Sequence, residues 1–321
     1  MALDGGRLGP VTLVGASITS VQFGAALAAT LFPHVGPSGV VALRSVVAAV
    51  ALTVAARPWS TPGPGSTPGP GATPEPGAWQ RLRTPVALGV VLAVMNTCVY
   101  QALARLPLGV VITLEFLGPL GVALAHSRRR ADVAVALAAG AGVVLLAAPA
   151  DAGPGRGGGL DPLGVGLALL GALGWALYIL LNRELGHRRT GGGSGLATAA
   201  LVAAVLTAPV GLASAGTALL RPHVLLVGVA VGLLSSALPF SLDRLALRRL
   251  TPGPYGVLMS VNPAMATLAG LLVLHQAPGT VQLAGTALVV TASAVASAAA
   301  ARRPITAGPS LQATAASADT A

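Results

Sequence analysis

The stretch that decides the fold is LGVVITLEFLGPLGVAL, residues 108–124, in which Glu115 is the one charged residue. Apolar side chains follow one another here without the alternation that marks a half-buried strand. A run of about 20 such residues is the length that a helix needs to cross the hydrocarbon core of a bilayer. Because lipid offers the backbone no hydrogen-bond partners, the stretch is predicted to be a membrane-spanning helix.

Similar apolar runs recur along the chain on both sides of this stretch. Hydrophobic residues make up 54% of the sequence and charged residues 9%, with a mean hydropathy of +0.79. An ordinary soluble domain carries roughly 25% charged residues, so this chain cannot cover itself with polar surface. We therefore predict an all-α integral membrane protein with ten transmembrane helices, at residues 11–32, 38–56, 84–103, 107–125, 131–149, 162–182, 194–213, 222–243, 252–273 and 280–300.

Three segments fall outside the predicted spans. Residues 1–10 form a short N-terminus, and residues 57–83 contain the Pro/Gly-rich linker TPGPGSTPGPGATPEPG, which can neither form a helix nor pack. Residues 301–321 are rich in Ala, Thr, Ser and Pro without periodicity and are expected to be a disordered tail.

The arginines predict the orientation, because cytoplasmic loops retain positive charge. With the N-terminus inside, fifteen arginines are cytoplasmic, three face outward, and Arg44 lies within a span. Both termini are therefore predicted to be cytoplasmic.

Several classes of function lack support. The net charge of +10 comes from short basic clusters without interleaved aromatic residues, so no nucleic-acid partner is indicated. The single cysteine, Cys98, excludes a disulfide framework, and the five histidines fall at span ends or in loops, without metal-ligand spacing. Neither a Walker-type loop nor a protease motif occurs, so we expect no enzyme, no cofactor and no metal.

An internal duplication is visible in two pairs of segments. Residues 39–44 correspond to residues 195–200, and Gly118-Pro119 corresponds to Asn262-Pro263. The second offset is shorter by 12 residues, which a longer linker in the first half explains. Two five-helix repeats are predicted, residues 11–149 and 162–300. Because five is odd, the repeats would be inverted about an axis in the membrane plane.

Glu115 is the best single site candidate, because it is the acidic residue deepest within a span. Pro119 has no N–H to donate to the Glu115 carbonyl, and Gly118 loosens the same turn. Such a helix break is tolerated where it lines a cavity, and a carboxyl group in this low dielectric can exchange protons. The alternative is a buried kink with a structural carboxylate.

Arg44 lies in the apolar segment VVALRSVVAA, residues 40–49, where a charged side chain is costly. It is expected to face a cavity or a carboxylate. The alternative is a structural arginine whose side chain reaches the membrane surface.

Further polar residues could line a cavity. Pro263 predicts a second helix break, and Tyr255, Met259 and Asn262 share one face there. Asn96 with Tyr100 and Thr97 with Gln101 form a polar stripe, as Trp175 and Tyr178 do in the sixth span. Hydrogen bonds between helices are an equally good interpretation. Asp243 is interpreted as an ion-pair partner of Arg244, and Gly228 and Gly232 as a close-packing face.

The segments FPHVGPSGVVALR (32–44), LEFLGPLGVAL (114–124), WALYIL (175–180), SSALPFS (235–241) and LMSVNPA (258–264) together resemble an EamA-type permease. The similarity points to the threonine/homoserine exporter branch of the drug/metabolite transporter superfamily and runs from about residue 12 to 300. It implies a multi-pass protein of the bacterial inner membrane that exports small amino acids in exchange for protons. It places Arg44, Glu115 and Pro119 on positions that this branch shares.

Two departures concern the second half. Relatives usually carry Glu before the second-half proline, where this chain has Asn262, and Gly-Glu after the ninth span, where it has His275-Gln276. Either Glu115 alone serves coupling, or the cargo differs from threonine and homoserine.

Three functions compete. The first is a proton-coupled exporter of neutral amino acids with Glu115, Arg44, Asn262, Tyr100 and Gln101 at its site. The second is an efflux permease for drugs or other small metabolites. The third is a membrane-embedded enzyme or sensor, for which the sequence offers no catalytic constellation or soluble domain. The sequence leaves open whether two copies form a homodimer.

Overall fold

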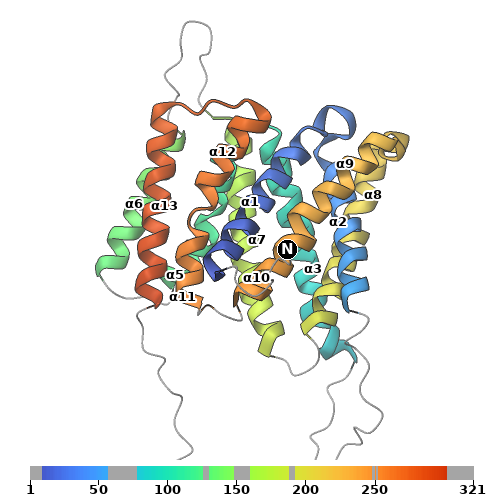
Figure 1. The fold of residues 1–321 in the computed structure, drawn as a ribbon, viewed down its shortest axis with the longest axis horizontal. Coiled ribbons are helices and arrows are strands. Elements are labelled where there is room, and N and C mark those ends of the chain that lie inside the picture. The colour runs from blue at the N-terminus through green and yellow to red at the C-terminus, as the bar shows by residue number, and fades with distance from the viewer. Residues whose placement is uncertain are drawn as a thin grey trace, which may run out of the picture.

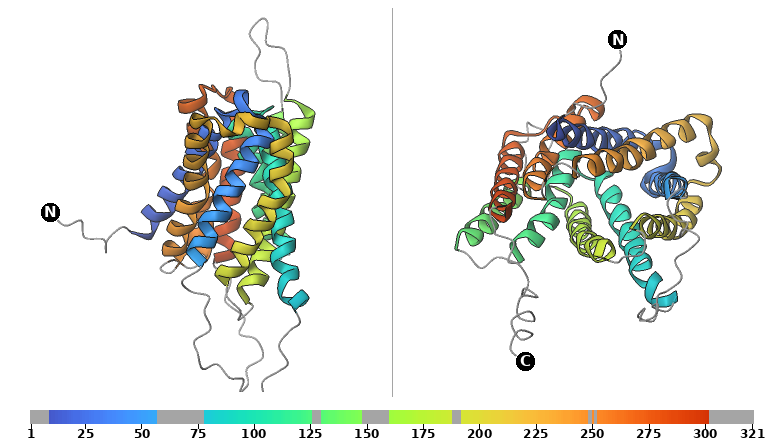
Figure 2. Two further views of the ribbon diagram at one scale, coloured as in Figure 1. Left: turned by 90° about the vertical axis from the view of Figure 1, so that its right-hand side faces the viewer. Right: turned by 60° about the horizontal axis from the view of Figure 1, so that its bottom comes forward.

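The computed structural model describes residues 9–56, 78–125, 130–147, 160–187, 192–247, 250 and 252–301, and every element within these ranges is helical. Figure 1 shows most of these helices side by side in one bundle, and Figure 2 shows the bundle from two further directions. The helices of the first half are α1 (Pro10–Ala29), α2 (Phe32–Ala56), α3 (Ala78–Leu103), α4 (Leu108–Glu115), α5 (Leu117–Ala125) and α6 (Arg130–Ala147).

The second half is also helical, with more interruptions. Its elements are α7 (Pro162–His187), α8 (Gly192–Ala215), the 3₁₀-helix η2 (Gly216–Leu220), α9 (Pro222–Gly232), the π-helix η3 (Leu233–Ala237), α10 (Leu238–Leu247), α11 (Pro252–Met259), α12 (Asn262–Leu274) and α13 (Thr280–Ala301).

The described helices have the apolar character of a membrane protein. Within the described ranges, six helices are long and apolar enough to cross a membrane, and four shorter apolar helices lie at Leu108–Val122, Val133–Leu146, Pro222–Ser236 and Thr280–Ala296. Large apolar side chains also cover the outside of the bundle, as at Leu137, Val205 and Leu226. Such a surface is stable in lipid and not in water. The prediction of an all-helical membrane protein is confirmed.

One predicted boundary is wrong. The linker was predicted to extend to residue 83, but α3 begins at Ala78, so its first six residues are helical. Ala78-Trp-Gln-Arg-Leu-Arg83 contains no glycine or proline, and a helix can therefore continue backwards from the apolar run. The rest of the linker, the eight N-terminal residues and the tail after Ala301 lie outside the described residues.

Two helix breaks occur where proline predicts them, and a third, at Gly36, was not predicted. The stretch at 107–125 is divided into α4 and α5 at Phe116, and the stretch at 252–273 is divided into α11 and α12 at Ser260 and Val261. Gly36 interrupts α2 near its start, with a φ of 66° that favours glycine. Phe116 is held in place by an edge-to-face contact with Trp175 of α7, with ring centroids 5.5 Å apart.

The two halves of the chain pack against each other throughout. α2 lies along α8, α6 along α13, and α4 along α12, while α3 packs on α7 and α8. α1 packs on α10, η3 and α12, and α2 on α9. The predicted close-packing face of Gly228 and Gly232 is confirmed, because these glycines bring α9 against Leu43 and Val47 of α2.

Candidate functional site

Arg44 of α2 is held by three neutral groups from other helices. Its Nη1 donates a hydrogen bond of 2.5 Å to Oδ1 of Asn96 on α3, and its Nη2 donates one of 3.5 Å to the carbonyl oxygen of Ser235. The guanidinium carbon lies 5.5 Å from the ring centroid of Tyr100, over the face of that ring. The charge of Arg44 is therefore solvated by dipoles and an aromatic face.

The Ser235 carbonyl is available because of the local sequence. Pro239, four residues later, has no N–H to donate to it. The chain relaxes into the π-helix η3, in which the Leu238 N–H bonds to the Leu233 carbonyl. The Leu234 carbonyl then accepts a hydrogen bond of 2.6 Å from the Ser20 hydroxyl of α1. One proline thus supplies backbone acceptors to both α2 and α1.

Glu115 is the last residue of α4 and is buried, with 8% of its surface exposed. Arg44 is the charged group that acts on it electrostatically. Within the described structure the two side chains are too far apart for a direct ion pair. Arg44 and Glu115 thus interact electrostatically without direct contact.

The helix break beside Glu115 also depends on Gly118. A Cβ atom at position 118 would collide with the Ala172 carbonyl of α7, so glycine is required for this close approach. At Gly121, one turn further along α5, a Cβ atom would have nothing within 4 Å. Gly118 therefore allows α5 to pack closely on α7, and Pro119 prevents one continuous helix from forming across the two elements.

In the second half, Asn262 accepts a hydrogen bond of 2.8 Å from the Gln22 amide of α1. Its own amide lies 3.3 Å from the Met259 sulfur, across the break between α11 and α12. Pro263 occupies the first turn of α12, where its missing N–H is not needed. Both side chains of the Gln22–Asn262 pair are buried, and Oε1 of Gln22 has no hydrogen-bond partner among the described residues.

The remaining predicted site residues lie in three places. Asn96 and Tyr100 lie at Arg44, and the buried Tyr100 hydroxyl has no partner among the described residues. Gln101 instead bonds to Ser38 at 3.1 Å and accepts a hydrogen bond from the exposed Arg105, near the end of α3. Tyr178 lies near Asp243, towards the opposite ends of the helices. The side chain of Arg244, the predicted partner of Asp243, is not among the side chains that the structure describes.

Sequence reasoning did not find Gln22 or the Ser235 carbonyl. Gln22 is the one amide side chain in α1, which is a usable signal. Its partner could not be read from the sequence, because the contact depends on α1 packing against α12.

The His275-Gln276 segment ends α12 and caps α4. His275 ends α12 in the left-handed conformation, with φ 54° and ψ 32°, where a glycine would be unstrained. Oε1 of Gln276 accepts a hydrogen bond of 2.9 Å from the Leu108 N–H at the start of α4. The first N–H groups of a helix need such acceptors, so this side chain caps α4 from the opposite half of the chain.

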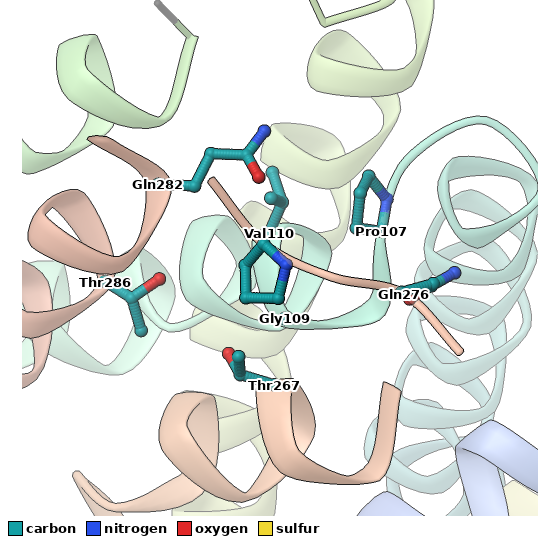
Figure 3. Close-up of a pocket in the computed structure, with 8 residues that line it drawn as sticks. Pro107, Gly109, Val110, Thr267, Gln276, Gln282 and Thr286 are labelled. Atoms are coloured by element: carbon teal, nitrogen blue, oxygen red, sulfur yellow. The ribbon is translucent and has the colours of Figure 1, made fainter. Parts of the chain in front are cut away.

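Figure 3 shows a small cavity beside this cap, between the start of α4, α12 and α13. Its volume is about 20 Å³, enough for one water molecule. It lies away from Arg44 and Glu115, and its lining residues are Pro107, Gly109, Val110, Thr267, Gln276, Pro278, Gln282 and Thr286. Among the described residues no three His, Cys, Asp or Glu side chains come together as a metal site would require.

The chain is similar to known transport proteins. Residues 162–298 match the EamA-like transporter family. The chain is 35% identical to the threonine/homoserine exporter RhtA of Escherichia coli (strain K12) over 285 residues, which are 88% of this chain and 90% of that protein. It is 33% identical over the same lengths to the threonine/homoserine exporter RhtA of Salmonella typhimurium (strain LT2). One crystal structure, of a protein 22% identical, shares the fold with a TM-score of 0.58 over 91% of this chain and 98% of the other.

Proposed function

The chain belongs to the EamA-like transporter family, close to the threonine/homoserine exporters, and we propose that it exports small neutral amino acids of this kind in exchange for protons. It is a membrane transporter and not an enzyme.

The proposed topology is ten transmembrane helices in two inverted repeats in the bacterial inner membrane, with both termini cytoplasmic. The packing pattern supports it, since exchanging the halves maps one set of contacts onto another. Two pairs join a helix to its own counterpart, namely α2 with α8 and α6 with α13, and the broken span of α4 and α5 contacts its counterpart through α4 and α12. The contact of α3 with α7 has its counterpart in α10 with α1, and that of α3 with α8 in α9 with α2.

The proposed repeats are residues 11–149 and 162–300. The family match over residues 162–298 supports the limits of the second repeat. The corresponding breaks, at Phe116 in α4/α5 and at Ser260 and Val261 in α11/α12, support the pairing of the halves. Such discontinuous helices mark the binding site in carriers with inverted repeats.

One observation carries the proposed cargo site: among the described residues Arg44 has only neutral direct partners, and it acts on the buried Glu115 without contact. A zwitterionic amino acid bears a carboxylate and an ammonium group on the same carbon. Arg44 would bind the carboxylate and Glu115 the ammonium, with Asn96 and Tyr100 beside them. When cargo leaves, a proton on Glu115 would replace the ammonium charge.

The two departures from the relatives are compatible with this cargo. Asn262 makes a neutral amide pair with Gln22, so the second break is held together without a charge. Gln276 caps α4, a task that either an amide or a carboxylate oxygen can perform. Glu115 would then carry the coupling alone at this depth.

Everted membrane vesicles test the proposal, because their bath contacts the cytoplasmic face. Labelled threonine or homoserine should accumulate when the vesicle lumen is acidified, and a proton carrier should abolish this accumulation. In Glu115→Gln the accumulation driven by the pH gradient should be lost. Asp161→Asn is the control, because this carboxylate is at the start of α7 and pairs with Arg105 at 3.5 Å. If Glu115→Gln accumulates cargo as the parent does, the role of Glu115 is wrong.

The identity of the cargo needs a separate measurement. The metabolites in the medium of cells with and without the protein should be compared. The largest difference in concentration should be in small neutral amino acids. A difference confined to hydrophobic compounds or drugs would contradict the proposed cargo and favour an efflux permease.

A further inference from the structure

Asp243 lies in a cluster of polar side chains that the site described above does not include. It is in α10, four residues before the helix ends at Leu247, and thus near the proposed cytoplasmic end. The hydroxyl groups of Ser17 and Tyr255 lie near its carboxylate, and the Ser17 hydroxyl donates a hydrogen bond of 3.5 Å to the Pro239 carbonyl oxygen of the same helix. Tyr178 is close enough to interact with its charge. The four residues come from α1, α7, α10 and α11, so elements of both halves meet here.

One oxygen of this carboxylate has no partner. Oδ1 of Asp243 is sealed from solvent and accepts no hydrogen bond among the described residues. A carboxylate oxygen that is buried without a donor is unfavourable, and a proton or a cation would relieve it. An ammonium group has no room at a sealed oxygen, whereas a proton needs none.

The neighbouring elements supply hydroxyl groups in place of a cation. α1 contains no charged residue, and it presents Ser17, which is buried. Among the described side chains, the titratable groups near the carboxylate on other helices are Tyr178 of α7 and Tyr255 of α11. Arg244 is the next residue along the chain, and its side chain lies outside the described ones.

We propose that Asp243 is a second proton-binding site of this carrier, at the cytoplasmic end, which releases to the cytoplasm the proton that Glu115 receives. The inference rests on the proposed exchange of cargo for protons. Protonation adds an O–H at Oδ1 and removes the negative charge, with no other bond made or broken.

Protonation of Asp243 would also change how the helices are held together. A hydrogen bond from the Tyr255 hydroxyl would be stronger to a carboxylate than to a neutral carboxyl group. The charged form of Asp243 would therefore tie α10 to α11, the short helix before the second break, while α1 is joined to α10 by the Ser17 hydroxyl, which donates to the Pro239 carbonyl. The protonated form loosens this tie, so that proton occupancy and closure of the cytoplasmic end are linked.

Everted vesicles allow the pH of the cytoplasmic face to be varied alone, with the lumen held at one acidic pH. The rate of threonine uptake by the parent protein should change with bath pH. In Asp243→Asn this dependence on bath pH should disappear, while exchange of labelled for unlabelled threonine at equal pH continues. The asparagine imitates the protonated form, and Asp161→Asn, at the opposite end, should keep the dependence of the parent.

A gentler variant guards against misfolding of Asp243→Asn. Tyr255→Phe keeps the ring and removes the hydroxyl group that would donate to the charged carboxylate. Its pH profile at the cytoplasmic face should move to higher pH by about 0.5 to 1 unit, the size expected for one hydrogen bond.

The outcomes separate the two proposals. If the parent shows gradient-driven uptake and both variants retain its bath-pH profile, Asp243 is not a proton site and the proposed function stands. If the parent shows no gradient-driven uptake of any neutral amino acid, the proposed function itself is wrong, and this inference falls with it.

Discussion

The Arg44 guanidinium lies within an apolar helix, and the described groups that contact it are uncharged. Asn96 and the Ser235 carbonyl take two of its nitrogens, and Tyr100 covers one face. A buried ion pair at this place would hold Arg44 too firmly to release it for cargo. Neutral partners satisfy the donors and leave the charge itself available.

Replacing Arg44 by lysine tests whether the planar fork matters. Arg44→Lys keeps the charge, but an ammonium cannot reach Asn96 and Ser235 together or lie flat on Tyr100. We expect the KM for threonine exchange to rise about tenfold, which corresponds to about 1.4 kcal/mol. Arg221→Lys, exposed at the start of α9, is the control and should leave the KM unchanged. An unaltered KM in Arg44→Lys would remove Arg44 from the cargo site.

His275 offers a prediction about stability. Its left-handed backbone costs a non-glycine residue roughly 1 to 2 kcal/mol, so His275→Gly should raise the apparent melting temperature in detergent. His223→Gly is the matched control, because its position is in the first turn of α9 and glycine there should lower the melting temperature. A lower melting temperature for His275→Gly would mean that the imidazole makes contacts that outweigh the strain.

The charged candidates could be selected from the sequence, because a charge inside an apolar run is rare. Arg44 and Glu115 were found in this way. Asp243 was not selected, since the adjacent Arg244 seemed to provide its partner, whereas its hydroxyl neighbours come from residues far away in the chain. Gln22 was not selected either, because its partner Asn262 is also far away in the chain. Contacts between distant segments depend on helix packing, which a local pattern does not contain.

At the scale of helices, proline predicted where α4/α5 and α11/α12 break. The π-helix at η3 was not predicted, although Pro239 is its cause, because a missing N–H can be accommodated by a kink, a break or a change of register. Which of these occurs depends on the groups that bind the carbonyl oxygens left without a backbone N–H. Here Arg44 and Ser20 take the two free carbonyl groups.

Gly118 and Gly121 form a matched pair for testing the close packing of α5 on α7. Gly118→Ala should destabilise the protein by about 1 to 3 kcal/mol, because α5 must move away from the Ala172 backbone of α7. Gly121→Ala should be neutral or slightly stabilising, because its methyl group meets nothing and alanine favours the helix. Thermal unfolding of the two purified variants, followed by the loss of monodisperse protein, measures the difference. Equal melting temperatures would show that α5 is not seated through Gly118.

For the whole molecule, the arginine pattern and the repeat both predict the proposed topology. Cys98, the single cysteine, is buried in α3, so Cys98→Ala provides a background for thiol labelling. In that background Gly157→Cys should react with an impermeant thiol reagent in intact cells, and Gly65→Cys only in everted vesicles. The same labelling of both positions from one side would contradict ten spans with cytoplasmic termini.

The amide pair of Gln22 and Asn262 has an electrical consequence. Moving one elementary charge through a membrane potential of 100 mV involves about 2.3 kcal/mol of work. If residue 262 were a carboxylate, moving it to another depth in the membrane would require this work, unless the carboxylate took up a proton. Two amides carry no net charge, so α1 and α12 can separate and meet again at a rate that the voltage across the membrane does not set.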